Sequence, residues 1–134
     1  MRIRWHGHSC FEIENGIVVV TDPHDGESIG LKQPRINADI VLVSHRHYDH
    51  NSVKTVSTEQ TKVIDTIGKS TANGIEFFGI ESAHDEQNGK KRGRNIIYKF
   101  KIGSVNFCHL GDLGHEVDDE KLKEIGKVDI LFIP

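Results

Sequence analysis

The sequence predicts an α/β protein of the α+β kind, a single domain over residues 1–134 with mostly antiparallel or mixed sheets and few helices. Two observations lead to this class. Short apolar runs are bounded by glycine, asparagine or proline, as is typical of strands and turns. Helix-start signals occur only around residues 51–56 and 118–125. No internal repeat or low-complexity linker divides the chain.

The first half of the chain is expected to begin with three strands, the second and third joined by a two-residue hairpin turn at Asn15-Gly16. Residues 22–38 contain two prolines and two glycines and predict a long loop. That loop leads into a buried strand, a short helix and a further strand. In order, the expected elements are the strands Arg2–Trp5, Cys10–Glu14, Ile17–Thr21 and Asp39–Val43, the helix Asn51–Val56 and the strand Lys62–Asp65.

The second half is expected to hold four strands and one helix. A long strand leads into a polar, glycine-bearing turn at Gln87–Arg94, and Gly103-Ser104 joins the next two strands. Acidic residues at its start indicate a helix around Asp118–Ile125. The expected strands are Ile75–Ala83, Asn95–Ile102, Val105–His109 and Val128–Pro134.

Composition narrows the class of protein without identifying a substrate. The chain has 17 Lys and Arg against 20 Asp and Glu, a net charge of −3, which argues against broad electrostatic capture of nucleic acid but leaves a local basic groove possible. No apolar stretch approaches a membrane span and the N-terminus lacks a signal-peptide core, so we expect a cytoplasmic protein with no membrane partner. Cys10 and Cys108 have no Cys-x-x-Cys partner and are expected to be buried free thiols.

The segment from Ser44 to His50 predicts a metal site. His45 and His47 follow the apolar run Asp39–Val43 at a spacing of two, which turns both rings to one side of an extended backbone. Asp49 and His50 precede residues that end a strand, so the chain is expected to turn and direct them toward a second, adjacent position. The alternative, a solvated polar loop or an adventitious chelator, does not explain ligand types at such regular spacing.

Two further strand ends can complete this constellation. His84 lies where the strand Ile75–Ala83 stops, and His109 and Asp112 follow the strand Val105–His109. Either histidine would provide the third imidazole of a tetrahedral site begun by His45 and His47. An aspartate between two ions can bridge them at the roughly 3.5–4 Å separation of two-metal sites.

The pattern His45-x-His47-x-Asp49-His50 resembles the signature of the metallo-β-lactamase superfamily. Within it the chain is similar to the compact hydrolases related to phosphorylated-ascorbate lactonase, through Trp5 to Phe11, Thr21-Asp22-Pro23 and His109-Leu110-Gly111-Asp112. This resemblance implies an αββα sandwich. Relatives continue past the strand Val128–Pro134, so the match is to the N-terminal part of that fold, C-terminally incomplete relative to the family.

The resemblance also implies roles for individual residues. His45, His47 and His84 correspond to ligands of a first metal, Asp49 and His50 to ligands of a second, and Asp112 to a bridging carboxylate. Asp22 resembles a buried aspartate that orients a ligand histidine, the alternative being an ordinary Asp-Pro turn. His109 is expected to line the site and His8 to contact substrate. His6, His24 and His115 are expected to be ordinary surface or hydrogen-bonded residues.

One departure from the family concerns the second metal. Relatives supply it with a last histidine, whereas this sequence has none after His115. Asp49, His50 and Asp112 are then the most that this sequence offers, which leaves the second position under-coordinated or completed by water. Without the second half of the fold, apolar surface of the first half would lose the segments that cover it in relatives. A homo-oligomer, a separate partner chain or a longer parent protein would each cover that surface.

These observations predict a binuclear, zinc-dependent hydrolase that uses a metal-bound hydroxide on a small-molecule phosphoester or lactone, with manganese or iron as other possible metals. Asp49 is the candidate catalytic residue. The alternatives are a non-catalytic metal-binding domain that needs a partner chain and, more weakly, a nuclease, against which the acidic charge counts. The basic segment from Lys90 to Arg94 is interpreted as a solvated hairpin tip rather than a phosphate site.

Overall fold

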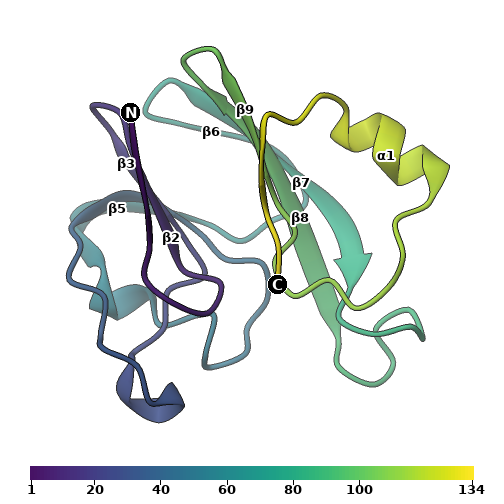
Figure 1. Ribbon diagram of the computed structural model, residues 1–134, viewed down its shortest axis with the longest axis horizontal. Coiled ribbons are helices and arrows are strands. Elements are labelled where there is room, and N and C mark those ends of the chain that lie inside the picture. The colour runs from purple at the N-terminus through teal and green to yellow at the C-terminus, as the bar shows by residue number, and fades with distance from the viewer. The chain divides into compact units, whose positions relative to one another are not determined.

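The computed structural model describes residues 1–134. The chain forms two compact units, unit 1 (Met1–Asp65) and unit 2 (Thr66–Pro134), and each contains one five-stranded sheet (Figure 1). The sequence predicts that residues 1–134 form a single domain, and this stays a prediction.

The sheet of unit 1 has the order β1-β2-β3-β4-β5. β1, β2 and β3 pair antiparallel, whereas β3, β4 and β5 run parallel. The short helices η1 and η2 lie in its connections. Its elements are β1 (Arg2–Trp5), β2 (Phe11–Glu14), β3 (Val18–Thr21), η1 (Glu27–Ile29), β4 (Ala38–Leu42), η2 (Val53–Thr55) and β5 (Ser57–Ile64).

The parallel half of this sheet brings polar segments to one edge. Thr21, Leu42 and Ile64 are successive partners at the ends of β3, β4 and β5. Because parallel strands share a direction, the residues that follow them leave the sheet at the same edge. The strands are held by a cluster of buried apolar side chains: Cys10, Val20, Ala38, Val41, Val43 and Val56. The sheet therefore fixes the start of the loop that follows β4.

Unit 2 has the order β10-β9-β8-β7-β6, antiparallel except for the parallel pair of β9 and β10. Helix α1 (Asp119–Ile125) lies against β7 and buries Ile125. The Asp118 side chain accepts a hydrogen bond from the Lys121 N–H at 2.8 Å and so caps its start. The strands are β6 (Gly68–Ala72), β7 (Ile75–Ala83), β8 (Arg94–Ile102), β9 (Val105–His109) and β10 (Ile130–Phe132).

Most expected elements are present, although β5 begins at Ser57 rather than Lys62, and three further details differ. The predicted helix at 51–56 is only the short 3-10 helix η2, because the run Val53-Lys54-Thr55-Val56 is rich in β-branched residues that resist helix formation. The hairpin at Asn15 has three connecting residues rather than two, with Gly16 at a φ of 76°. Strand β6 is missed from the sequence because Gly68–Ala72 is short and largely polar.

No helix has the length and apolar character needed to cross a membrane.

Both cysteine side chains are fully buried and neither forms a disulfide. Burial raises the pKa of the Cys10 thiol to about 12, and the nearby Asp22 charge adds to the effect. Burial raises the pKa of the Cys108 thiol to about 11. The structure thus confirms the prediction of buried free thiols.

We expect iodoacetamide at pH 8 to leave both thiols unmodified in the native protein, since the reactive thiolate is scarce and shielded. Intact-mass measurement should show two added groups once guanidinium unfolds the chain. Rapid labelling of Cys10 or Cys108 in the native state would contradict the buried placement.

Candidate metal centre

The loop after β4 gathers imidazole rings at the end of the sheet of unit 1. His45 is buried, His50 is fully buried, and His47 is exposed. The His45 ring centroid lies 4.6 Å from that of His47 and 4.2 Å from that of His50. A hydrogen bond from the His50 N–H to the His47 carbonyl, at 3.0 Å, closes the turn between them. The predicted clustering of these histidines is therefore present within the unit.

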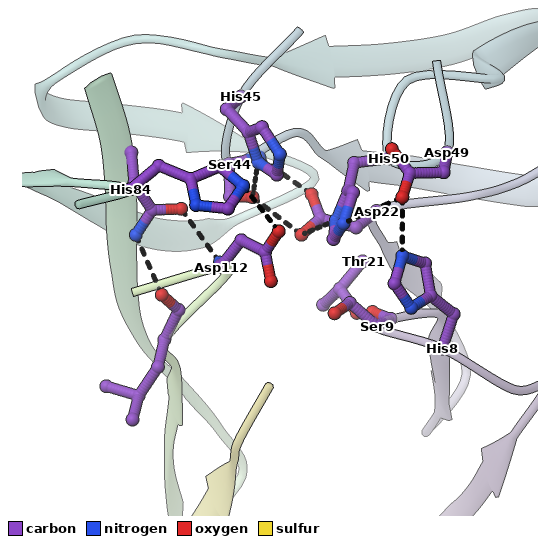
Figure 2. Close-up of polar contacts among 12 residues, drawn as sticks. His8, Ser9, Thr21, Asp22, Ser44, His45, Asp49, His50, His84 and Asp112 are labelled. Atoms are coloured by element: carbon purple, nitrogen blue, oxygen red, sulfur yellow. Dashed lines mark hydrogen bonds and ion pairs between the residues drawn. The ribbon is translucent and has the colours of Figure 1, made fainter. Parts of the chain in front are cut away.

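Asp22, which directly follows β3, supports this loop. Its side chain is fully buried and accepts hydrogen bonds from the Ser44 N–H at 2.7 Å and the Ser44 hydroxyl at 2.6 Å. Its Oδ2 also lies 3.2 Å from Nδ1 of His50, and Ser44 Oγ lies 2.9 Å from Nδ1 of His45 (Figure 2). One carboxylate thus fixes the start of the loop and the orientation of a histidine ring. An ordinary Asp-Pro turn at the surface would need neither the burial nor these contacts.

His8 joins the same cluster from the loop between β1 and β2. Its Nε2 lies 2.9 Å from Oδ2 of Asp49, and its ring centroid lies 4.5 Å from that of His50 (Figure 2). The His8 carbonyl accepts a hydrogen bond from the Trp5 indole N–H at 2.8 Å, which fixes this backbone. His8 is therefore a further nitrogen donor beside Asp49, where the sequence predicts only a contact to substrate.

The potential ligand atoms of unit 1 form two overlapping groups. His8, Asp49 and His50 form one, and Asp22, His45 and His50 form the other; within each group the ligand atoms lie within 4.8 Å of one another. Burial raises the pKa of Asp49, but the hydrogen bond to His8 and the neighbouring His50 outweigh this effect and lower it overall. Asp49 is thus a carboxylate at neutral pH. Mixed imidazole and carboxylate donors of this kind fit zinc, manganese or iron.

In unit 2, His84 follows β7 and Asp112 follows β9. Nε2 of His84 lies 2.7 Å from Oδ2 of Asp112, so these two strand-end residues meet as the sequence predicts. His109 is also buried, and its ring packs edge-on against Phe132 at 6.3 Å between centroids.

Asn95 is a positioning residue that sequence reasoning misses. Its fully buried side chain donates to the Leu110 carbonyl and to Ser82 Oγ, both at 2.8 Å, and accepts from the Asp112 N–H at 2.9 Å. It therefore holds the turn that presents Asp112. A single asparagine at the start of a strand gives no signal of this role in one sequence.

The three histidines without a predicted role are hydrogen-bonded. His6 Nε2 lies 2.6 Å from Glu12, and His115 Nε2 accepts from the Ala83 N–H at 3.1 Å. His24 is fully buried, with Nε2 3.1 Å from the His6 carbonyl, and burial lowers its pKa. These contacts agree with ordinary hydrogen-bonding roles.

Comparison with known proteins identifies relatives. The family model of the beta-lactamase superfamily domain matches residues 2–134. The UPF0173 metal-dependent hydrolase of Thermoplasma volcanium is 28% identical over 158 residues, covering 100% of this chain and 70% of that protein. The UPF0173 metal-dependent hydrolase of Shouchella clausii is 28% identical over 131 residues, covering 94% of this chain and 55% of that protein.

Solved structures agree with this match. A Thermotoga maritima protein of the metallo-beta-lactamase superfamily is 37% identical with a TM-score of 0.75, covering 96% of this chain and 58% of that one. The metallo hydrolase Igni18 of Ignicoccus hospitalis shares the fold, with a TM-score of 0.64 and 17% identity over 96% of this chain and 68% of its own. The predicted superfamily and α/β fold class are thereby confirmed, and the chain spans little more than half of the Thermotoga structure.

Proposed function

The chain belongs to the beta-lactamase superfamily, and on this basis we propose that it is a metal-dependent hydrolase that acts on a phosphoester or lactone-type group of a small molecule. The observation that carries the proposal is the set of imidazole and carboxylate donors at the end of the unit 1 sheet. The curated relatives described above are named metal-dependent hydrolases, which supports the same reaction class.

We assign His45, His47 and His84 to a first divalent ion and Asp49 and His50 to a second, with Asp112 as a shared ligand. The ring contacts among His45, His47 and His50 support the unit 1 part of this set. The contact between His84 and Asp112 supports the unit 2 part, because it places an imidazole and a carboxylate together at two strand ends. Zinc suits an imidazole-rich set best, and manganese or iron also accepts one with carboxylates.

Two such ions, when bound, would lower the pKa of a water molecule toward about 7 and polarise the substrate oxygen. The protein's own groups then orient the reactants. Asp49 remains ionised at neutral pH and can accept a hydrogen bond from the attacking water. His8 holds the Asp49 carboxylate in place, and Asp22 fixes the tautomer and orientation of His50.

The assignment of His84 rather than His109 can be tested by metal content. His84→Ala should lower the bound metal, whereas His109→Ala should alter packing against Phe132 and leave the metal content closer to that of the wild type. Loss of metal in His109→Ala but not in His84→Ala would show that His109, and not His84, is the metal ligand.

Hydrolysis of model substrates tests the proposed function. Protein loaded with zinc or manganese should hydrolyse bis(p-nitrophenyl) phosphate or a simple lactone, and chelation should abolish the turnover. Protein that binds metal but turns over none of these substrates would favour the non-catalytic alternative, a metal-binding domain that depends on a homo-oligomer or partner chain. Selective cleavage of RNA would favour a nuclease.

A further inference from the structure

A buried carboxylate organises the loop that joins β7 to β8. Oδ1 of Asp85 accepts the backbone N–H groups of Gln87 and Gly89 at 2.7 and 2.9 Å. Oδ2 accepts those of Lys91 and Arg92 at 2.9 and 2.7 Å. The loop is the hairpin tip that the sequence predicts, with Lys91 and Arg92 exposed, and four backbone bonds to one side chain give it a defined conformation.

The base of this loop is also closed. The Gly93 N–H donates to the Gly89 carbonyl at 2.9 Å, and the His84 N–H donates to the Gly93 carbonyl at 3.0 Å. Gly89 has a φ of 82°, a conformation that favours glycine. The backbone of Lys91 and Arg92 is therefore connected to the proposed metal ligand His84 through Asp85 and Gly93.

This loop forms one wall of a pocket of about 400 Å³ that also contains His84 and Asp112. Lys91 and Arg92 line the pocket from the loop. The lining also includes Gly114, where a Cβ atom would come within 2.3 Å of the His84 backbone. Gly114 thus allows that segment to pack against His84, and its N–H donates to the Ala83 carbonyl at 3.0 Å.

The charges of the pocket favour an anionic ligand. Lys91 and Arg92 are exposed and form no ion pair, whereas Arg94 at the base of the same loop lies 3.5 Å from Glu81. Two carboxylates that line the pocket already have partners. Asp85 accepts hydrogen bonds from four backbone N–H groups, and Asp112 contacts His84. Glu86 is the one other carboxylate in the lining that could balance the positive charges of Lys91 and Arg92. Leu113 is the only large apolar side chain in the lining. Such a wall suits a compact charged group rather than an apolar one.

We propose that Lys91 and Arg92 recognise a phosphate group of the substrate, and that Asp85 is the positioning residue that holds them beside His84 and Asp112. Arginine matches phosphate oxygens with paired donors, and lysine adds a second positive charge. The claim that this phosphate belongs to a substrate rests on the proposed hydrolase function, whereas the claim that Lys91 and Arg92 bind phosphate does not. It narrows the substrate from the phosphoester and lactone classes to a phosphorylated small molecule.

Binding can be measured without metal or turnover. Phenyl phosphate should be titrated into chelator-treated protein and followed by its phosphorus NMR signal. The double variant Lys91→Gln/Arg92→Gln should bind about tenfold more weakly or worse, because two charge-assisted contacts are lost. Lys90→Gln is the matched control, since Lys90 is exposed on the same loop but does not line the pocket. Equal affinity of the double variant and the wild type, or an equal loss in Lys90→Gln, would overturn the proposal.

Asp85→Ala should weaken phenyl phosphate binding although it leaves both cations in place, because the loop loses its four backbone bonds. Asp85→Asn, which keeps an acceptor oxygen, should retain more of the affinity. Unchanged binding in Asp85→Ala would show that the loop does not depend on this carboxylate.

Kinetics on the zinc- or manganese-loaded protein separates this proposal from the general function. The double variant should raise KM for p-nitrophenyl phosphate about tenfold and leave the hydrolysis of neutral p-nitrophenyl acetate nearly unchanged. Wild-type protein that binds phenyl phosphate through Lys91 and Arg92 but hydrolyses no ester would contradict the proposed function alone. Turnover with unaltered KM in the double variant would contradict the phosphate site alone.

Discussion

Asp49→Ala is expected to lower the hydrolytic turnover of the metal-loaded protein by about a hundredfold or more, equivalent to roughly 3 kcal/mol of barrier. The substitution removes the carboxylate that contacts His8 at 2.9 Å and lies 3.7 Å from Nε2 of His50. The first metal should remain bound, since His45, His47 and His84 are unchanged, whereas the second should be lost. The folded state should be affected little, because the Asp49 side chain is only partly buried.

Asp65→Ala is the matched control for this substitution. Asp65 follows β5 at the same edge of the sheet, but it is exposed and pairs with Arg46 at 3.3 Å. It should retain wild-type turnover and metal content. Undiminished turnover in Asp49→Ala would show that the two-metal mechanism does not operate, and outright unfolding would make Asp49 a structural residue.

Asp22→Ala is expected to have the largest effect on stability. The fully buried carboxylate accepts two hydrogen bonds from Ser44 and contacts His50, so its removal leaves several buried polar groups without their acceptor. We expect a loss of about 3 kcal/mol in the free energy of unfolding of the metal-free protein, or roughly 10 °C in Tm. Thermal melts in the presence of chelator measure this directly.

Asp39→Ala provides the comparison. Asp39 lies in the same sheet, is half-buried and accepts one backbone hydrogen bond, from the Val18 N–H at 2.7 Å. Its removal should cost only about 1 kcal/mol. Similar melting temperatures for the two variants would show that Asp22 does not anchor the ligand loop.

The sequence predicts the strand-end histidine loop well because its signals are local. A buried apolar run fixes where β4 ends, and the spacing of His45 and His47 then determines that their rings cluster. The pairing of His84 with Asp112 is also anticipated, since each follows a strand that the alternation of apolar residues predicts. Strand β6 has no such pattern, although Asn73-Gly74, with φ values of 50° and 78°, was a hairpin signal of the same kind as Asn15-Gly16.

The residues that escape prediction act through backbone contacts between distant segments. Asn95 holds the turn before Asp112, and Asp85 collects four N–H groups from the following loop. Neither contact can be recognised from the periodicity or composition of the sequence, because an isolated polar residue at a strand end is usually solvated. The sequence predicts the solvent-exposed tip that carries Lys91 and Arg92, and both are exposed, but it gives no signal that they also line a pocket with His84.

The central claim is that the loop from His45 to His50 holds divalent metal, and elemental analysis of untagged protein tests it most directly. The wild-type protein, purified without chelator, should contain zinc, manganese or iron in at least stoichiometric amount. The double variant His45→Ala/His47→Ala should contain almost none, whereas His115→Gln, which removes a histidine outside the cluster, should retain the full content. Full metal content in His45→Ala/His47→Ala would contradict the account.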